Sequence, residues 1–235
     1  MLADKFWSEY FKVYDVLNLV IPYQELLQEI LKQTEIKKGD LVLDAGGGTG
    51  NLALLFEKEG AKVINLDFSQ EALNIYKRKN PNGQMILADL TKTLPFPDNY
   101  FDKIVSNNTL YNIPRDIRLS VILELKRILK PSGKIVISNI HKDFKPIKIY
   151  LNTIKENIKK EGIFNTIKLI FKMLVPTIKM FYYNAIIQKE HKFNKNNLFD
   201  FNEQEKLLKE LNFINISKTK LVYANQGILN SAIKS

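Results

Sequence analysis

The sequence predicts an α/β fold built around a mostly parallel sheet. Short apolar runs with strand character alternate with amphipathic segments of helical spacing over the first two thirds of the chain. The run LVLDAGGGTG (41–50) also joins a buried strand to the start of a helix through four glycines. Because strands separated by helices run in the same direction, we expect a parallel sheet with helices on both faces.

The elements are expected in a regular order. Two helices, over 3–21 and 23–33, should precede the sheet, with Pro22 ending or kinking the first. The core should then contain strands at 41–45, 62–67, 84–89, 102–107 and 134–140, and helices at 51–58, 69–79 and 116–129, with one more helix between the third and fourth strands. Pro131-Ser132-Gly133 is expected to form a turn that ends a helix.

The last third should complete a single domain. We expect a basic, helical insertion over 141–199, a helix over 201–211, and an antiparallel pair of strands at 213–223 and 227–233. The domain then divides into N-terminal cap helices (1–39), a core (40–140), the insertion (141–199) and a last helix with a terminal hairpin (200–235).

Composition excludes several kinds of chemistry. The 235 residues include no cysteine, which removes disulfides, thiolate zinc sites and cysteine nucleophiles. With only two histidines, a metal site is not expected, and His191, in a Lys/Asn-rich run, should be at the surface. The N-terminus does not resemble a secretory signal and no apolar stretch reaches about 18 residues, so a cytoplasmic protein is predicted.

The positive charge is concentrated in one segment. The formal net charge is +10, yet residues 1–140 are nearly balanced, whereas 141–199 contain 12 lysines and 4 acidic residues. The basic part of the chain is therefore distinct from the glycine-rich part.

The glycine-rich turn predicts a ligand that carries an ammonium group. Glycines allow positive φ angles and a close approach of backbone to ligand. The acidic Asp44 ends the strand before them, and a carboxylate there would repel a pyrophosphate. In an open parallel sheet, ligands bind at the carboxyl ends of the strands, where Asp67, Asp89 and Asn107 also stand.

These segments resemble a known family. Residues 41–50 resemble motif I of the class I S-adenosylmethionine-dependent methyltransferases. LPFPDNYFDKIVSNN (94–108) and LKRILKPSGKIVISN (125–139) resemble later segments of the branch that includes ubiquinone/menaquinone-type (methyltransferase type 11) enzymes, as does Tyr14-Asp15 before an apolar helix. The resemblance implies a Rossmann-like sheet of seven strands and S-adenosylmethionine as cofactor.

The resemblance also implies roles for individual residues. Gly46, Gly48 and Gly50 would surround the methionine part of the cofactor, whose amino end Asp44 favours, and Tyr14 and Ala45 would also bind the cofactor. Asp67 would bind the ribose, with Phe68 over the adenine, and Asp89 and the Leu90 backbone N–H would bind the adenine edge. Asn107 would lie at the methionine end.

Other interpretations of these residues stay open. Asp67 could cap the helix that follows it, and Asp89 could be a turn residue. Gly48-x-Gly50-x-x-Ala53 also fits the dinucleotide fingerprint of dehydrogenases, but those enzymes have no acid at the position of Asp44.

A motif that the sequence lacks narrows the range of possible methyl acceptors. Residues 107–110 read NNTL, not the [DNS]PP[YFW] motif with which amino-methylating nucleic-acid enzymes hold a flipped base. Nucleic-acid acceptors are therefore disfavoured. His141, after the fifth strand, is a candidate general base or a surface histidine, and Tyr111 either contacts the acceptor or packs.

The insertion indicates the kind of acceptor. Along 163–181 apolar residues cover most of a helix, and Lys168, Lys172 and Lys179 fall within about 40° of one another. Pro176 should bend it. We expect a lid that also makes peripheral contact with an anionic membrane, and an apolar or lipid-like acceptor such as a prenylated quinone precursor. The alternatives are an RNA or protein methyltransferase using the basic segment, and a non-catalytic S-adenosylmethionine-binding module.

Overall fold

A computed structural model describes residues 4–190 and 197–235. The helices and strands follow one another in this order: α1 (Asp4–Tyr14), the 3-10 helix η1 (Asp15–Leu19), α2 (Ile21–Thr34), β1 (Leu41–Ala45), α3 (Asn51–Lys58), β2 (Lys62–Asp67), α4 (Gln70–Lys79), β3 (Gln84–Leu87), β4 (Phe101–Asn107), the 3-10 helix η2 (Leu110–Asn112), α5 (Arg115–Ile128), β5 (Leu129–Ile140), α6 (Pro146–Glu190), α7 (Glu203–Glu210), β6 (Phe213–Ile214), β7 (Lys220–Val222) and β8 (Gly227–Lys234).

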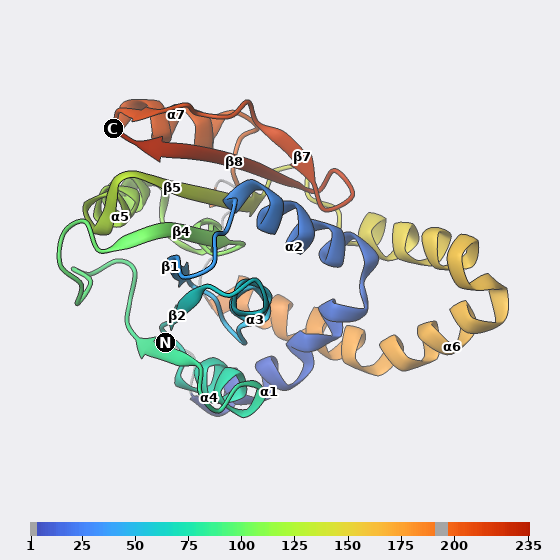
Figure 1. Cartoon of the computed structure of the whole chain (residues 1–235). Coiled ribbons are helices and arrows are strands. Elements are labelled where there is room, and N and C mark those ends of the chain that lie inside the picture. Colours follow the sequence, from blue (N-terminus) through green and yellow to red (C-terminus); the bar gives the residue numbers. More distant parts are fainter. Residues whose placement is uncertain (1–3, 191–196) are drawn as a thin grey trace.

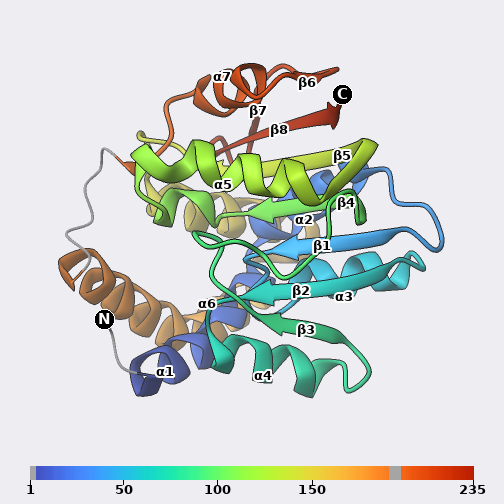
Figure 2. The same ribbon diagram turned by 90° about the vertical axis from the view of Figure 1, so that its left-hand side faces the viewer.

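The strands form one mixed sheet (Figures 1 and 2). Its order is β3-β2-β1-β4-β5-β8-β6, with β7 also paired to β8. The strands β1 to β5 are parallel, and β8 is antiparallel to β5. The strand order reverses between β1 and β4, the position at which open α/β sheets bind ligands. The predicted fold class is therefore confirmed.

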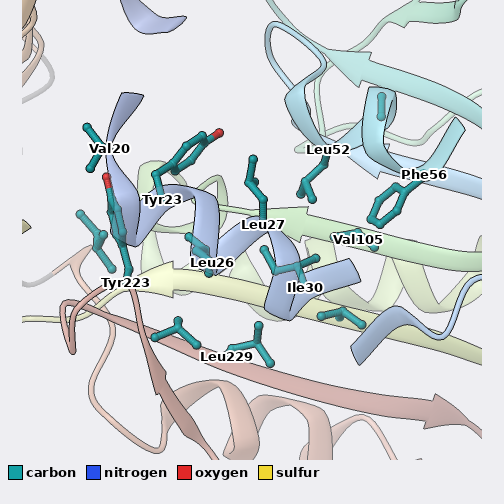
Figure 3. Close-up of a cluster of buried hydrophobic side chains, with 14 of the residues drawn as sticks. Val20, Tyr23, Leu26, Leu27, Ile30, Leu52, Phe56, Val105, Tyr223 and Leu229 are labelled. Atoms are coloured by element: carbon teal, nitrogen blue, oxygen red, sulfur yellow. The ribbon is translucent and has the colours of Figure 1, made fainter. Parts of the chain in front are cut away.

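Alternating side chains divide the core into two layers. On β1, Val42 faces the layer under α2 and α3, whereas Leu43 faces the layer under α5 and α7. The period of two along a strand produces this alternation. Figure 3 shows the first layer, where Leu26 and Ile30 of α2 lie close to side chains of the sheet and of α3.

The sheet has eight strands where seven were predicted, because the sixth is interrupted. β6 pairs Phe213 with Lys234, whereas β7 pairs Lys220 with Leu229, so the register shifts between them. Asn215, at φ 48°, lies in the interruption. The antiparallel terminal pair itself is confirmed.

Two predictions on the core segments were wrong. Residues 88–100 form no helix, since Pro95 and Pro97 disfavour one; instead the Arg127 guanidinium donates to the Leu94 and Phe96 carbonyls. Pro131-Ser132-Gly133 does not precede β5 but lies within it, as an irregular bulge with Ser132 at φ 60°.

Pro22 begins a helix rather than ending one. The first helix changes to a 3-10 turn at Asp15, and Pro22 occupies the first turn of α2, where its missing N–H is tolerated.

The insertion forms two helical arms that meet at Gly162. This residue has φ 78° and ψ 171°, so the break occurs there and not at Pro176. The Asn157 side chain donates to Thr166 Oγ1 across the bend, and the Tyr150 and Phe181 rings lie 5.7 Å apart. α6 packs against α1, η1 and α2 and extends beyond the carboxyl edge of the sheet (Figure 1). In the described part of the chain, α6 included, no helix has the length and apolar content to span a bilayer.

Shortening a buried side chain of α2 should destabilise the fold. Leu26 is 1% exposed, so Leu26→Ala should lower the free energy of unfolding by about 2–5 kcal/mol, through lost burial and a cavity. Urea titration followed by circular dichroism measures this. The control Leu123→Ala removes a side chain that is 54% exposed and should change stability little; equal losses would contradict the packing described for α2.

Candidate functional site

The turn after β1 has the backbone that its glycines permit. Gly46, Gly48 and Gly50 have φ angles of 76°, 55° and 77°. The N–H groups of Gly46 and Gly47 donate to the Leu66 carbonyl, and Gly50 donates to the Gly47 carbonyl. The turn is thereby fastened to β2, and α3 starts directly behind it.

Neighbouring side chains also require glycine at two of these positions. A Cβ on Gly46 would come within 2.3 Å of Thr109 Cγ2, and one on Gly50 within 2.1 Å of Tyr76 Cδ2. At Gly48 the nearest atom would be 3.9 Å away, in Phe11. Gly48 is therefore the glycine of the turn with the most open surroundings.

Asp44 is a buried carboxylate with one free acceptor. Its Oδ2 accepts from the Ala53 N–H at 3.2 Å, whereas Oδ1 has no donor among the described residues. Burial, with repulsion from Asp67, raises the pKa of the Asp44 carboxyl to about 7. A bound cation would favour the ionised form.

Asn107 offers a second buried acceptor at the end of the adjacent strand β4. Its Oδ1 likewise lacks a donor within the described part of the chain. One carboxylate oxygen and one amide oxygen that lack donors among the described residues, at neighbouring strand ends, fit a ligand group that carries both positive charge and N–H donors. The amino group of S-adenosylmethionine has that chemistry, so these residues fit the cofactor that the sequence indicates.

Asp67, at the end of β2, holds the glycine turn. Its two oxygens accept from the N–H groups of Gly48 (3.0 Å) and Ser69 (2.9 Å), and burial raises the pKa of its carboxyl to about 6. Phe68 is 59% exposed beside it. The capping of the following helix falls to Ser69, whose Oγ accepts from the Ala72 N–H.

Asp89 and Leu90 follow the third strand. Asp89 is exposed, and its Oδ1 accepts from the backbone and the hydroxyl of Thr91. Leu90 is buried. These contacts describe a turn; the adenine-binding role of both residues stays a prediction.

A polar network that the sequence analysis missed joins the cap helices to the turn. Asp15 accepts from Thr49 Oγ1 at 2.8 Å and pairs with Lys79 at 2.7 Å. Lys79 also donates to the Thr49 carbonyl, and Asn65 donates to the Gly48 carbonyl. The pair Tyr14-Asp15 was the only signal for this network in the sequence.

Aromatic residues gather beside the turn. Tyr14 lies among the rings of Tyr10 and Phe11, with centroids 5.8 and 5.7 Å away, and Tyr23 faces Tyr223 at 6.1 Å. Burial raises the pKa of all four tyrosines, that of Tyr23 to about 12. These phenols are therefore neutral at physiological pH.

Tyr111, on η2, belongs to the same region. Its N–H donates to Asn139 Oδ1 at 3.2 Å, and burial raises the pKa of its phenol. Its side chain packs against both core layers.

His141 has backbone partners at both ring nitrogens. Nδ1 accepts from the Asp143 N–H at 3.2 Å, and Nε2 lies 2.9 Å from the Asn225 carbonyl, to which it therefore donates. This pairing does not favour a general base, and the catalytic role of His141 stays a prediction. His191 lies outside the described residues. Within 4–190 and 197–235, no group of three acidic or histidine side chains is placed to hold a metal ion.

Comparisons with known proteins agree with this geometry. Residues 43–137 match the model of a methyltransferase domain. The chain is 28% identical over 224 residues to the demethylmenaquinone methyltransferase of Staphylococcus saprophyticus, covering 92% of this chain and 88% of the relative. It is 31% identical over 150 residues to the ubiquinone/menaquinone biosynthesis C-methyltransferase of Francisella philomiragia, and this alignment covers 58% of this chain and 59% of the relative. Alignments with several other relatives span only 55–56% of their length.

Solved structures show the same fold. A S-adenosylmethionine-dependent methyltransferase from Aquifex aeolicus superimposes with a TM-score of 0.61 and 19% identity, covering 94% of each chain. The fold, together with the match of residues 43–137, supports a class I S-adenosylmethionine-dependent methyltransferase. Within that class the chain is similar to the ubiquinone/menaquinone type.

Replacing Asp44 should stabilise the cofactor-free protein at about pH 8 but weaken cofactor binding. Because its folded pKa, about 7, exceeds the unfolded value of about 3.9, the folded state holds a proton in this range that the unfolded state releases. The free energy of unfolding of the cofactor-free protein should therefore fall as pH rises from about 4 to about 7. Asp44→Asn should then be more stable than the native protein at about pH 8 and not at about pH 4.

The same variant should bind S-adenosylmethionine about tenfold more weakly at about pH 8, because the ammonium group loses a charged acceptor. Thermal unfolding and calorimetry measure the two effects. The exposed Asp116→Asn serves as control. A cofactor affinity equal to that of the native protein would contradict the role given to Asp44.

Gly50→Ala should disrupt the turn more than the matched change Gly39→Ala. Both glycines have positive φ, at 77° and 91°, but a Cβ meets Tyr76 only at Gly50. We expect a loss of about 1 kcal/mol for Gly39→Ala, and a larger one with at least about tenfold weaker cofactor binding for Gly50→Ala. Urea titration and calorimetry test this, and similar behaviour of the two variants would contradict it.

Proposed function

We propose that this enzyme transfers the methyl group of S-adenosylmethionine to an apolar or lipid-like acceptor, with a prenylated quinone precursor as the leading candidate. The main support is the similarity to relatives named as menaquinone and ubiquinone methyltransferases, one of which aligns over 88% of its length. The aromatic surroundings of the turn are compatible with a ring-shaped acceptor.

In this proposal, residues at different strand ends bind different parts of the cofactor. The Gly46, Gly48 and Gly50 turn, with Ala45 and Tyr14, surrounds the methionine part, and Asp44 and Asn107 accept from its amino group. Asp67 receives the ribose hydroxyls on its remaining lone pairs, Phe68 covers the adenine, and Asp89 and Leu90 meet its edge. The cofactor supplies a sulfonium-bound methyl group for in-line displacement.

The chain's own contribution is to align the acceptor and exclude water. Tyr111 contacts the acceptor, and His141 is kept as a candidate base. The described parts of segments 1–39 and 141–199 cover the cofactor half, 40–140, while 200–235 completes the sheet. Helix α6 acts as a lid, because it packs on α1, η1 and α2 at the carboxyl edge.

We also propose a peripheral contact of residues 163–181 with an anionic membrane, for a protein located in the cytoplasm. An apolar acceptor dissolves in the bilayer, so a membrane-bound lid would shorten its path to the site.

The acceptor can be identified by label transfer. The enzyme is incubated with methyl-labelled S-adenosylmethionine and an organic-soluble extract of the host, and label is expected in a quinone-like compound. Label in RNA or protein instead would support the basic-segment alternative. Cofactor binding without turnover on any fraction would support the non-catalytic module.

Asp67→Asn tests the cofactor site independently of the acceptor. An amide would place its NH₂ group against the N–H of Gly48 or Ser69, so we expect S-adenosylmethionine to bind at least about tenfold more weakly. Calorimetry measures the affinity, with Asp116→Asn as control. A change below about twofold would show that Asp67 does not hold the ribose.

A further inference from the structure

The second arm of α6 exposes a continuous apolar stripe. Ten large apolar side chains between 163 and 182 are at least 38% exposed, with Phe164 at 71% and Phe171 at 73%. At about 100° per residue, they fall within a sector of about 140°. The members of this stripe are Ile163, Phe164, Ile167, Ile170, Phe171, Leu174, Val175, Ile178, Phe181 and Tyr182. Apolar surfaces of this extent mark binding surfaces.

The opposite side of the same arm is packed. Thr166, Met173 and Met180 are 2%, 6% and 8% exposed, and they fall outside the sector of the stripe. Met173 and Met180 belong to the core layer that contains Tyr23 and Tyr223. The arm therefore cannot bury its stripe by rotating, because rotation would expose the buried side.

Lysines line one margin of the stripe. Lys168, Lys172 and Lys179 occupy a sector of about 40° beside it, and Lys168 Nζ lies 4.7 Å above the centroid of the Phe164 ring. Between 163 and 186 the sequence contains no aspartate or glutamate. A broad apolar face with a purely basic margin is typical of helices that lie in the interface of an anionic membrane, with lysine heads at the level of the phosphates.

We infer that residues 163–182 dock on the surface of an anionic lipid bilayer, with the apolar stripe in the interface and the three lysines among the headgroups. The inference deepens the proposed function, on which it rests for the acceptor's origin. Asn184, near the end of this arm, accepts from the Tyr10 hydroxyl of α1 at 3.5 Å, so docking would place the arm between the bilayer and α1. On the first arm, Ile147 and Leu151 are also exposed, at 58% and 57%.

The positive charge beside the stripe favours an anionic bilayer over a second copy of the chain as the partner. A second copy of this chain would bring its own lysines against Lys168, Lys172 and Lys179, and like charges repel. An anionic bilayer complements them.

Vesicle co-sedimentation tests the apolar stripe. The full chain should sediment with vesicles of equal parts phosphatidylcholine and phosphatidylglycerol. The double variant Phe164→Ser/Phe171→Ser should bind at least about tenfold more weakly, because it removes two exposed rings from the interface. The matched control Leu87→Ser/Leu123→Ser removes side chains that are 53% and 54% exposed elsewhere, and it should bind as the native protein does.

A second set of variants tests the lysines. Lys168→Gln/Lys172→Gln/Lys179→Gln should lose most of the preference for the anionic vesicles over pure phosphatidylcholine, whereas Lys58→Gln/Lys62→Gln/Lys92→Gln, also at exposed positions, should keep it. If the native protein binds neither kind of vesicle, the inference is overturned. Light scattering that shows a dimer which Phe164→Ser/Phe171→Ser dissociates while vesicle binding is unchanged would also overturn it.

These measurements are independent of methyl transfer. Vesicle binding without labelled lipid would support the docking surface and contradict the lipid-like acceptor. Labelled quinone in detergent without vesicle binding would do the reverse.

Discussion

The buried carboxyl group of Asp44 constrains the cofactor edge of this protein. Asp44 is the penultimate residue of β1, inside the sheet, and its carboxylate has one backbone donor and one oxygen with no donor among the described residues. An ionised carboxylate in such surroundings is costly, and its pKa of about 7 expresses that cost. The neighbouring turn, with its three glycines at positive φ, brings backbone N–H groups and open space close to this charge. A positively charged ligand group would lower that cost, because it favours the ionised carboxylate.

The other parts of the site support the turn. Asp67 and Asn65 hold Gly48 from β2, Thr109 packs on Gly46 from the loop after β4, and Asp15 reaches Thr49 from the cap helices. These contacts come from three separate parts of the chain. A change in the position of α1 or η1 is therefore coupled to the turn, and α6 rests on those same helices.

The sequence was sufficient where local pattern decides the structure. The strand 41–45, the helix 51–58 and the strand 62–67 were predicted at their observed bounds, because short apolar runs, helical spacing and glycine-rich turns are local signals that act within a few residues. The family motifs placed Asp44, Asp67 and Asn107 at strand ends, where they lie.

Long-range partners were not predictable in the same way. Arg127 fixes the loop 88–100 from a distant helix, and Lys79 joins Asp15 over 64 positions. The break in α6 falls at Gly162, where a Cβ would meet no atom within 4 Å, so the positive φ alone requires glycine. The contact of His141 with Asn225 forms because β8, which follows Asn225, pairs with β5, and no local sequence pattern predicts it.

The interruption of the sixth strand has a further consequence for solubility. Both borders of the sheet are short: β3 has four residues on one side, and β6 and β7 have two and three on the other. An uninterrupted border strand would present a row of unpaired amides and carbonyls to a second molecule. Asn215 and the irregular backbone around it break that row, so strand-to-strand aggregation at this border is disfavoured by the backbone itself.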